Sequence, residues 1–176
     1  MNAVLNGKYS DSLIYRRHSV RRYSEAPVSQ EQLDHILHSA MAAPSANNCQ
    51  PWSFAVIDDR KLLDAMAEIH PYAGMMKTAP LAIVPCVIKR VARDDPFYPQ
   101  DLGACVQNIL LAAVECGLGS CWCGVHTQEA LEKKFASLLG MPDTMFPFCV
   151  IAIGHPAENS PPSDRYDASR VRRNHW

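Results

Sequence analysis

The stretch Asp101-Leu-Gly-Ala-Cys-Val-Gln-Asn-Ile-Leu-Leu-Ala-Ala-Val114 decides the fold, because the helix that it predicts is apolar on every face. A helix that is apolar all round is normally a buried one. A small domain has little material with which to wrap such a helix completely, so we expect a partner subunit to cover one side of it. The main apolar stripe comprises Leu102, Val106, Ile109, Leu110 and Ala113, and the other faces carry Ala104, Cys105, Leu111, Ala112 and Val114.

The segments around this helix predict a mixture of helices and strands. Ser29-Gln-Glu-Gln32 has the pattern of a capping box and predicts a helix that ends near Ala43-Pro44. Because the elements do not alternate as regular βαβ units, the sequence favours the α+β class. The further elements expected are helices over about 58–69 and 127–139, the second capped by Thr127, and strands over 53–57, 81–88, 121–124 and 146–153.

Length and composition predict one globular domain over residues 1–176, since hydrophobic residues make up 48% and charged residues 20% of the chain. The net charge of −1 argues against nucleic acid as a partner. The longest apolar run, Leu81–Ile88, is far too short to cross a membrane. Met1–Ser10 lacks the apolar core of a secretory signal, and the seven cysteines suit a reducing compartment, so we expect a cytoplasmic protein.

The densest polar cluster is Arg16-Arg-His-Ser-Val-Arg-Arg22. Guanidinium groups and a hydroxyl are the groups that bind phosphate. If the segment is extended, Arg17, Ser19 and Arg21 fall on one face. The alternative is a solvated basic surface segment with no ligand.

Two other segments carry polar or reactive side chains. Pro44-Ser-Ala-Asn-Asn-Cys-Gln-Pro-Trp52 is a stiff loop rich in hydrogen-bonding groups, and it could equally be a plain helix-to-strand connector. Cys121 and Cys123 are too close in sequence for a C-x-x-C motif, so packing in the core is favoured over metal or disulfide chemistry. No metal site is predicted. The sequence also contains no G-x-S-x-G, Walker, G-x-G-x-x-G or H-E-x-x-H motif, so hydrolase, P-loop and Rossmann functions are unsupported.

The order of these motifs along the chain resembles the nitroreductase family of FMN-dependent flavoproteins, from about Leu13 to the C-terminus. This resemblance implies a three-layer α-β-α sandwich, with a mixed or antiparallel central sheet around a buried helix, in an intertwined homodimer that binds FMN at its interface. The motifs that carry it are Arg17-His-Ser-Val-Arg21, Pro44-Ser-x-x-Asn-x-Gln-Pro-Trp52, Asp101-Leu-Gly-Ala, Gln107-Asn-x-Leu-Leu-Ala-Ala, Gly117-Leu-Gly-Ser-Cys-Trp-x-Gly124, Gly154-His-Pro and Arg165-Tyr-Asp.

The resemblance assigns cofactor-binding roles to the basic segment. Arg17 and Ser19 would hold the FMN phosphate, with His18 between them. Arg21 would lie beside N1 and O2 of the flavin, where negative charge collects on reduction, so a cation there favours the reduced anion.

The resemblance brings three further segments to the cofactor. Arg165 matches a C-terminal phosphate ligand, and residues 155–176 would form an arm laid over the partner subunit. Backbone N–H groups of the strand that holds Trp122, Cys123 and Gly124 would face N5 and O4 of the flavin, although a cysteine at position 123 departs from the family pattern. The loop that the other subunit would contribute holds Pro44, Ser45, Ala46, Asn48 and Gln50.

The activity implied is hydride transfer from NAD(P)H through flavin N5 to a nitroaromatic, a quinone or a similar acceptor, by a ping-pong mechanism that needs no catalytic side chain. Alternatives are a dehalogenating or flavin-degrading relative, and a flavin-binding sensor without turnover. Only a short loop is expected between Lys89 and Gln100. Phe97 and Tyr98 are candidates for lid aromatics, and local packing of both is the alternative.

Overall fold

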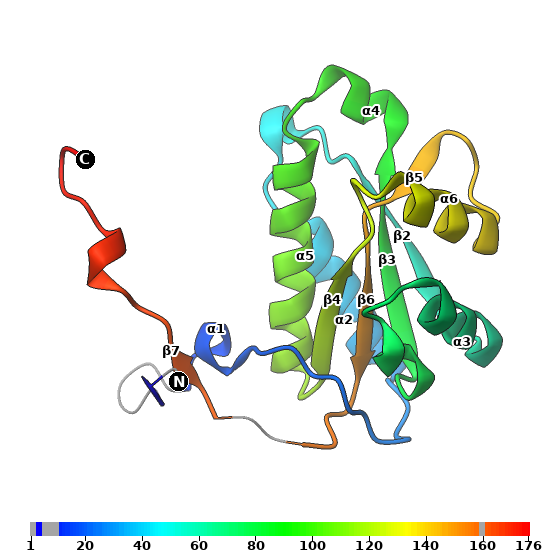
Figure 1. Cartoon of the computed structure of the whole chain (residues 1–176), viewed down its shortest axis with the longest axis horizontal. Coiled ribbons are helices and arrows are strands. Elements are labelled where there is room, and N and C mark those ends of the chain that lie inside the picture. The colour runs from blue at the N-terminus through cyan, green and yellow to red at the C-terminus, as the bar shows by residue number, and fades with distance from the viewer. Residues whose placement is uncertain (1–2, 5–10, 159–160) are drawn as a thin grey trace.

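The structure of the chain is a computed structural model that describes residues 3–4, 11–158 and 161–176. Its centre is a five-stranded sheet with the strand order β2-β3-β6-β4, in which β5 also pairs with β3 (Figure 1). Every strand pair of this sheet is antiparallel. The strands are β2 (Trp52–Ile57), β3 (Leu81–Ile88), β4 (Gly119–Gly124), β5 (Met145–Pro147) and β6 (Cys149–Gly154).

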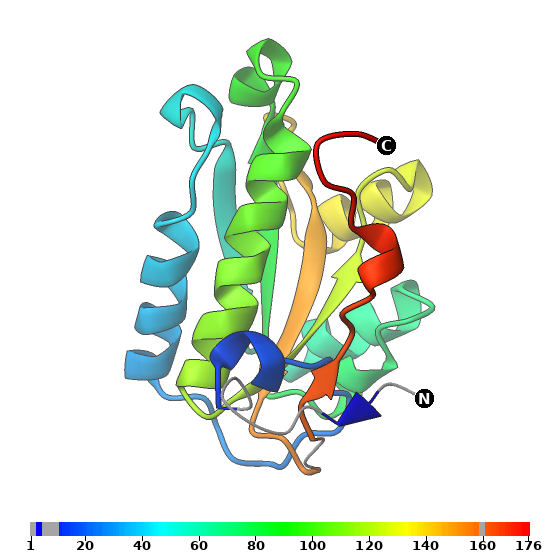
Figure 2. The ribbon, with the colours of Figure 1, turned by 90° about the vertical axis from the view of Figure 1, so that its left-hand side faces the viewer.

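Helices cover both faces of the sheet, because its strands are apolar on both faces. Helices α2 (Gln30–Met41) and α5 (Tyr98–Glu115) lie side by side on one face, as Figure 2 shows. Helices α3 (Arg60–Ile69) and α6 (Glu129–Leu138) pack on the other face, next to the short η2 (Gly74–Lys77). The two buried clusters share β3, whose residues alternate between them. This arrangement confirms the predicted α+β class and its three layers.

The capping signals formed as expected at two helices. At α2 the Ser29 hydroxyl accepts the N–H of Gln32 at 3.2 Å, and the Gln32 side chain accepts the N–H of Ser29 at 2.9 Å. At α3 the Asp59 carboxylate accepts the N–H of Lys61 at 2.7 Å. Each bond satisfies a backbone donor that the first helical turn leaves unpaired.

Three details differ from the sequence-based expectations. The expected strand over 146–153 is divided into β5 and β6, which pair with different parts of β3 on either side of Pro85. The expected loop between Lys89 and Gln100 contains a short helix, α4 (Lys89–Asp94). Helix α6 has Gln128 rather than Thr127 at its N-cap, and the Glu132 carboxylate instead accepts the Thr127 N–H.

Helix α5 is buried along the side that faces the sheet and α2. Its partly exposed strip includes Gly103, Ala104, Leu111 and Val114, all small or apolar. Cover of this strip by a partner subunit stays a prediction. Within the described residues, none of the helices combines the length and the apolar character that crossing a membrane requires.

A short strand near the start of the chain pairs with one near its end, beside the domain. Strand β1 (Ala3–Val4) pairs with β7 (Ser163–Asp164), and β7 lies next to α1 (Leu13–Arg16). Beyond β7 the chain runs away from the sheet through η3 (Ala168–Arg170) to an exposed end (Figure 1).

Candidate functional site

Strand β4 forms one edge of the central sheet and has one hydrogen-bonded neighbour, β6, among the strands described. The Val125 N–H donates to Phe148 O at 3.2 Å, and this pair continues the register of the ladder between β4 and β6. Because hydrogen-bonded pairs alternate along antiparallel strands, the backbone N–H and C=O groups of Cys121 and Cys123 also point toward β6. Ser120, Trp122 and Gly124 therefore turn theirs to the open edge. Residues from outside the sheet meet this edge at both ends of the strand.

The basic segment, Arg16–Arg22, lies along the open edge near the start of β4. The Val20 N–H donates to Ser120 O at 3.0 Å, and Ser19 forms a parallel bridge with Ser120. Val20 is buried, and the Tyr23 hydroxyl donates to its carbonyl at 2.7 Å. The approach requires a glycine at position 119, because a Cβ there would lie 2.6 Å from Cγ2 of Val20.

A pocket of about 430 Å³ opens between this segment, β4 and α5. Arg17 and Ser19 reach it from the basic segment, and Trp122 reaches it from β4. Ser120 contributes a buried hydroxyl oxygen that has no hydrogen-bond partner in the described part of the chain. An unpaired buried hydroxyl is costly, so its position beside Arg17 fits a bound group rich in acceptor oxygens. The lining comprises Ile14, Arg17, Ser19, Gln107, Leu110, Ser120 and Trp122.

Arg21 and His18 do not line this pocket. The neighbouring thiol of Cys123 and, to a smaller extent, the positive charge of Arg21 lower the pKa of Cys121, while burial opposes them. The thiol of Cys121 and burial in turn raise the pKa of Cys123. His18 uses Nδ1 to contact Arg16 O at 2.9 Å, and its buried Nε2 has no partner among the residues described.

The two thiols of β4 lie on the side of the strand opposite the pocket. The Cys123 thiol donates to Tyr72 O at 3.4 Å, and both thiols belong to the core cluster under α3 and α6. All seven cysteines are free, and none of them lines the pocket. Cys123 thus packs in the core, as the favoured interpretation of the sequence held.

The loop after α2 contacts the start of α5, whereas the pocket lies beside its middle and second half. The Ala46 N–H donates to the Asp101 carboxylate at 3.1 Å, in the first turns of α5. The Ser45 hydroxyl accepts the Gln50 N–H at 3.0 Å, and the exposed side chains of Gln50 and Asn48 bond to each other at 3.2 Å. Pro44 at the start of the loop is exposed. Within one chain the loop and the pocket are therefore separate.

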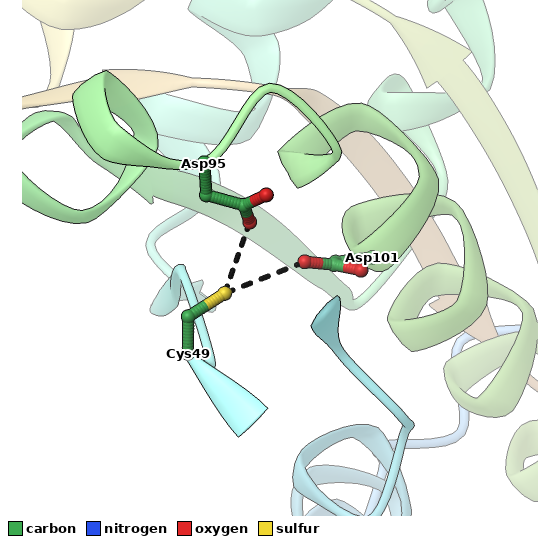
Figure 3. A group of neighbouring side chains, drawn as sticks. All are labelled: Cys49, Asp95 and Asp101. Carbon is green, nitrogen blue, oxygen red and sulfur yellow. Dashed lines mark hydrogen bonds between the residues drawn. The ribbon is translucent and has the colours of Figure 1, made fainter. Parts of the chain in front are cut away.

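A cluster that the sequence did not reveal fastens this loop to the segment before α5 (Figure 3). The Cys49 thiol donates to Asp95 Oδ2 at 2.9 Å and lies 3.6 Å from Asp101 Oδ2. Both carboxylates are buried, and burial together with these bonds raises the pKa of Cys49 to about 11. The sulfur of Cys49 thus lies within reach of both carboxylates. No local motif could have shown this, because the cysteine and the carboxylates are about fifty positions apart.

Neither Tyr98 nor Arg165 lines the pocket. The Tyr98 hydroxyl contacts His126 Nε2 at 2.9 Å, and the ring packs edge-on against Phe146, so local packing holds Tyr98. Phe97 is half exposed. Arg165 follows β7 beside α1, but it is exposed and does not line the pocket.

Known proteins resemble this chain in both sequence and fold. The model of the nitroreductase family matches residues 14–73 and 69–155. A curated relative from Methanothermobacter thermautotrophicus, named "Putative NADH dehydrogenase/NAD(P)H nitroreductase", is 39% identical over 163 residues, which cover 93% of this chain and 85% of the relative.

Solved structures of this family have the same fold. An FMN-dependent nitroreductase from Clostridium difficile is 29% identical with a TM-score of 0.86, over 93% of this chain and 98% of that one. A structure from Desulfovibrio desulfuricans that holds FMN is 31% identical with a TM-score of 0.80, over 97% of this chain and 99% of that one. The chain belongs to the nitroreductase family.

Proposed function

We propose that this chain is an FMN-dependent oxidoreductase that passes hydride from NAD(P)H to a nitroaromatic, a quinone or a similar acceptor. The observation that carries the proposal is the pocket at the open edge of β4, where Arg17 and Ser19 meet the unpartnered hydroxyl of Ser120. A guanidinium and two hydroxyls are suited to a phosphate. Similarity to FMN-binding and NAD(P)H-using members of the family supports the same cofactor and donor.

The residues of one chain would hold FMN along the edge of β4. Arg17 and Ser19 bind its phosphate, with His18 beside them and Arg21 toward the pyrimidine part of the ring. Bound FMN supplies a centre that accepts and donates hydride at N5.

Along β4, Trp122 lies next to the phosphate pocket and Gly124 presents its amide to the open edge. The ladder directs the N–H of Cys123 to β6 instead. Gly124 is therefore the better donor for the flavin, and Cys123 supports the strand from within the core.

A second copy of the chain would complete the site. About six residues of α5, or about 9 Å along its axis, separate Asp101 under the loop from Gln107, the nearest α5 residue of the pocket, and none of the loop residues lines the pocket. In a homodimer, Pro44, Ser45 and Ala46 come from the partner, with Asn48 and Gln50 as polar supports.

The C-terminal arm offers a second contact with the partner. Val171 and Trp176 are exposed hydrophobic residues of the arm, and Ile14 and Trp122 are exposed near the pocket. Exposed aromatic residues such as Trp122 and Trp176 suit an interface, where such side chains are enriched. Laid over the partner, the arm would bring Arg165 to a phosphate.

The donor and the acceptor use the open face of the site in turn, which gives ping-pong kinetics, and the chain binds and orients both without a dedicated acid or base. A reducing cytoplasm would keep the seven free thiols in the state seen in the structure.

The phosphate assignment is tested by replacing Arg17 with alanine. Loss of a charge-assisted hydrogen bond costs about 1.5–3 kcal/mol, so we expect FMN to bind about 10- to 150-fold more weakly. Arg16→Ala is the matched control, because Arg16 is an exposed neighbour of equal charge that does not line the pocket. A double Arg17→Ala, Ser19→Ala variant that keeps full FMN occupancy would refute the assignment.

A further inference from the structure

His70 is a buried histidine whose two ring nitrogens both have backbone partners. It follows α3 directly and is 2% exposed. Its Nδ1 accepts the N–H of Tyr72 at 3.1 Å, and its Nε2 lies 2.8 Å from Gly124 O. Because a backbone N–H can only donate, Nδ1 must be the acceptor, so Nε2 carries the proton and donates it to Gly124 O. The partners therefore define one neutral tautomer.

The position of the ring is fixed by packing as well as by these bonds. The ring meets Phe135 edge-on, with centroids 6.3 Å apart and planes at 84°. Phe135 is fully buried in the core under α3 and α6. The hydrogen bond from His70 to Gly124 is thus held by the core and does not depend on a mobile side chain.

This bond acts at the open edge of β4. The N–H and the C=O of Gly124 both point to that edge, and His70 takes up the C=O. The polar group that Gly124 still offers there is its N–H. A Cβ at position 124 would meet no atom within 4 Å, so space is open beside this donor.

We infer that His70 is a positioning residue that fixes the backbone at Gly124 so that its N–H donates to the flavin, and that it thereby sets the reduction potential of bound FMN. The inference rests on the proposed function, since it needs the flavin to lie along β4. A fixed donor facing the carbonyl edge of the ring stabilises the negative charge that grows there on reduction. His70 therefore favours reduced FMN over oxidised FMN.

Two substitutions separate this role from a purely structural one. His70→Leu keeps apolar volume but removes the donor, and we expect the affinity for reduced FMN to fall about tenfold relative to that for oxidised FMN. For a two-electron couple this corresponds to a midpoint potential lower by about 30 mV. His70→Gln can still donate to Gly124 O, and we expect it to keep the potential close to that of the wild type.

Arg17→Ala is the orthogonal control. The phosphate is the same in both redox states, so Arg17→Ala should weaken both affinities alike and leave the potential nearly unchanged. Potentials are measured on the holoprotein by equilibration with a reference dye, and affinities by flavin fluorescence. A wild-type chain that binds no FMN would contradict the proposed function. A His70→Leu variant that binds FMN with an unchanged potential would overturn the inference alone.

A second measurement needs neither FMN nor a folded leucine variant. Nitrogen NMR of the wild-type chain without cofactor should show His70 as the Nε2–H tautomer. A spectrum in which His70 carries its proton on Nδ1 would remove the bond to Gly124 and overturn the inference.

Discussion

Replacing Gly119 by alanine tests how the basic segment is held against β4. The added Cβ would lie 2.6, 2.8 and 2.9 Å from three side-chain carbons of Val20. One of these carbons is Cβ itself, so a rotation of the Val20 side chain cannot remove the contact. The backbone of the basic segment must therefore move away from β4.

The cost follows from close packing. Val20 is 3% exposed, and its N–H to Ser120 O bond is 3.0 Å long, so the movement strains a buried contact and a backbone hydrogen bond together. Overpacking of this kind costs about 1–3 kcal/mol. For a chain of this length, that lowers the melting temperature by about 2–12 °C. Because Val20 lies between Ser19 and Arg21, FMN affinity should fall as well.

Gly74→Ala is the matched control, since a Cβ there would meet nothing within 4 Å. It should leave FMN affinity unchanged and alter stability by no more than about 1 kcal/mol. Urea unfolding and flavin fluorescence measure both quantities. If Gly119→Ala is as stable as Gly74→Ala and binds FMN as tightly as the wild type, Val20 is not packed against β4 as described.

Three further predictions concern the core, the thiols and the arm. Phe135→Ala should lower the free energy of unfolding by about 3–5 kcal/mol because Phe135 is fully buried, whereas Phe97→Ala should cost far less; equal losses in urea unfolding would contradict the assigned core. Burial raises the pKa of Cys86 to about 11 and that of Cys105 to about 12. The free energy of unfolding should therefore be constant below about pH 9 and fall above it, by about 1.4 kcal/mol per pH unit for each thiol, because the unfolded chain loses these protons first. A free energy of unfolding that stays constant to pH 10.5 would be inconsistent with this. Removing residues 161–176 should shift sedimentation toward monomer and weaken FMN binding, and a truncated chain that stays dimeric with full occupancy would exclude a role for the arm.

The sequence predicted the main helices and the α+β class well because their signals are local, whereas the three layers were implied by the resemblance. The capping box at Ser29 and the apolar character of α5 are encoded within one element each, and the structure has both. The division of the last strand was not predictable in the same way, because it depends on pairing with β3 around Pro85.

The site was predicted in part. Arg17 and Ser19 are close in sequence, and alternation along an extended segment was enough to place them on one side, where both line the pocket. The same alternation also suggested Arg21, which does not line it. Ser120 and His70 were not predicted, because the roles proposed for them depend on the free edge of β4, and a single sequence does not show which strand lies at an edge. The cluster of Cys49, Asp95 and Asp101 was missed for a similar reason, since it joins a loop to a distant helix.

The central claim is that Arg17, Ser19 and the open edge of β4 form an FMN site that supports reduction by NAD(P)H. An anaerobic titration of the purified protein, followed by absorbance, tests it most directly. The account predicts a flavin spectrum that is bleached by NADH or NADPH and restored by a quinone or a nitroaromatic compound. A chain that retains no flavin after incubation with FMN, or whose bound flavin neither nicotinamide reduces, would contradict it.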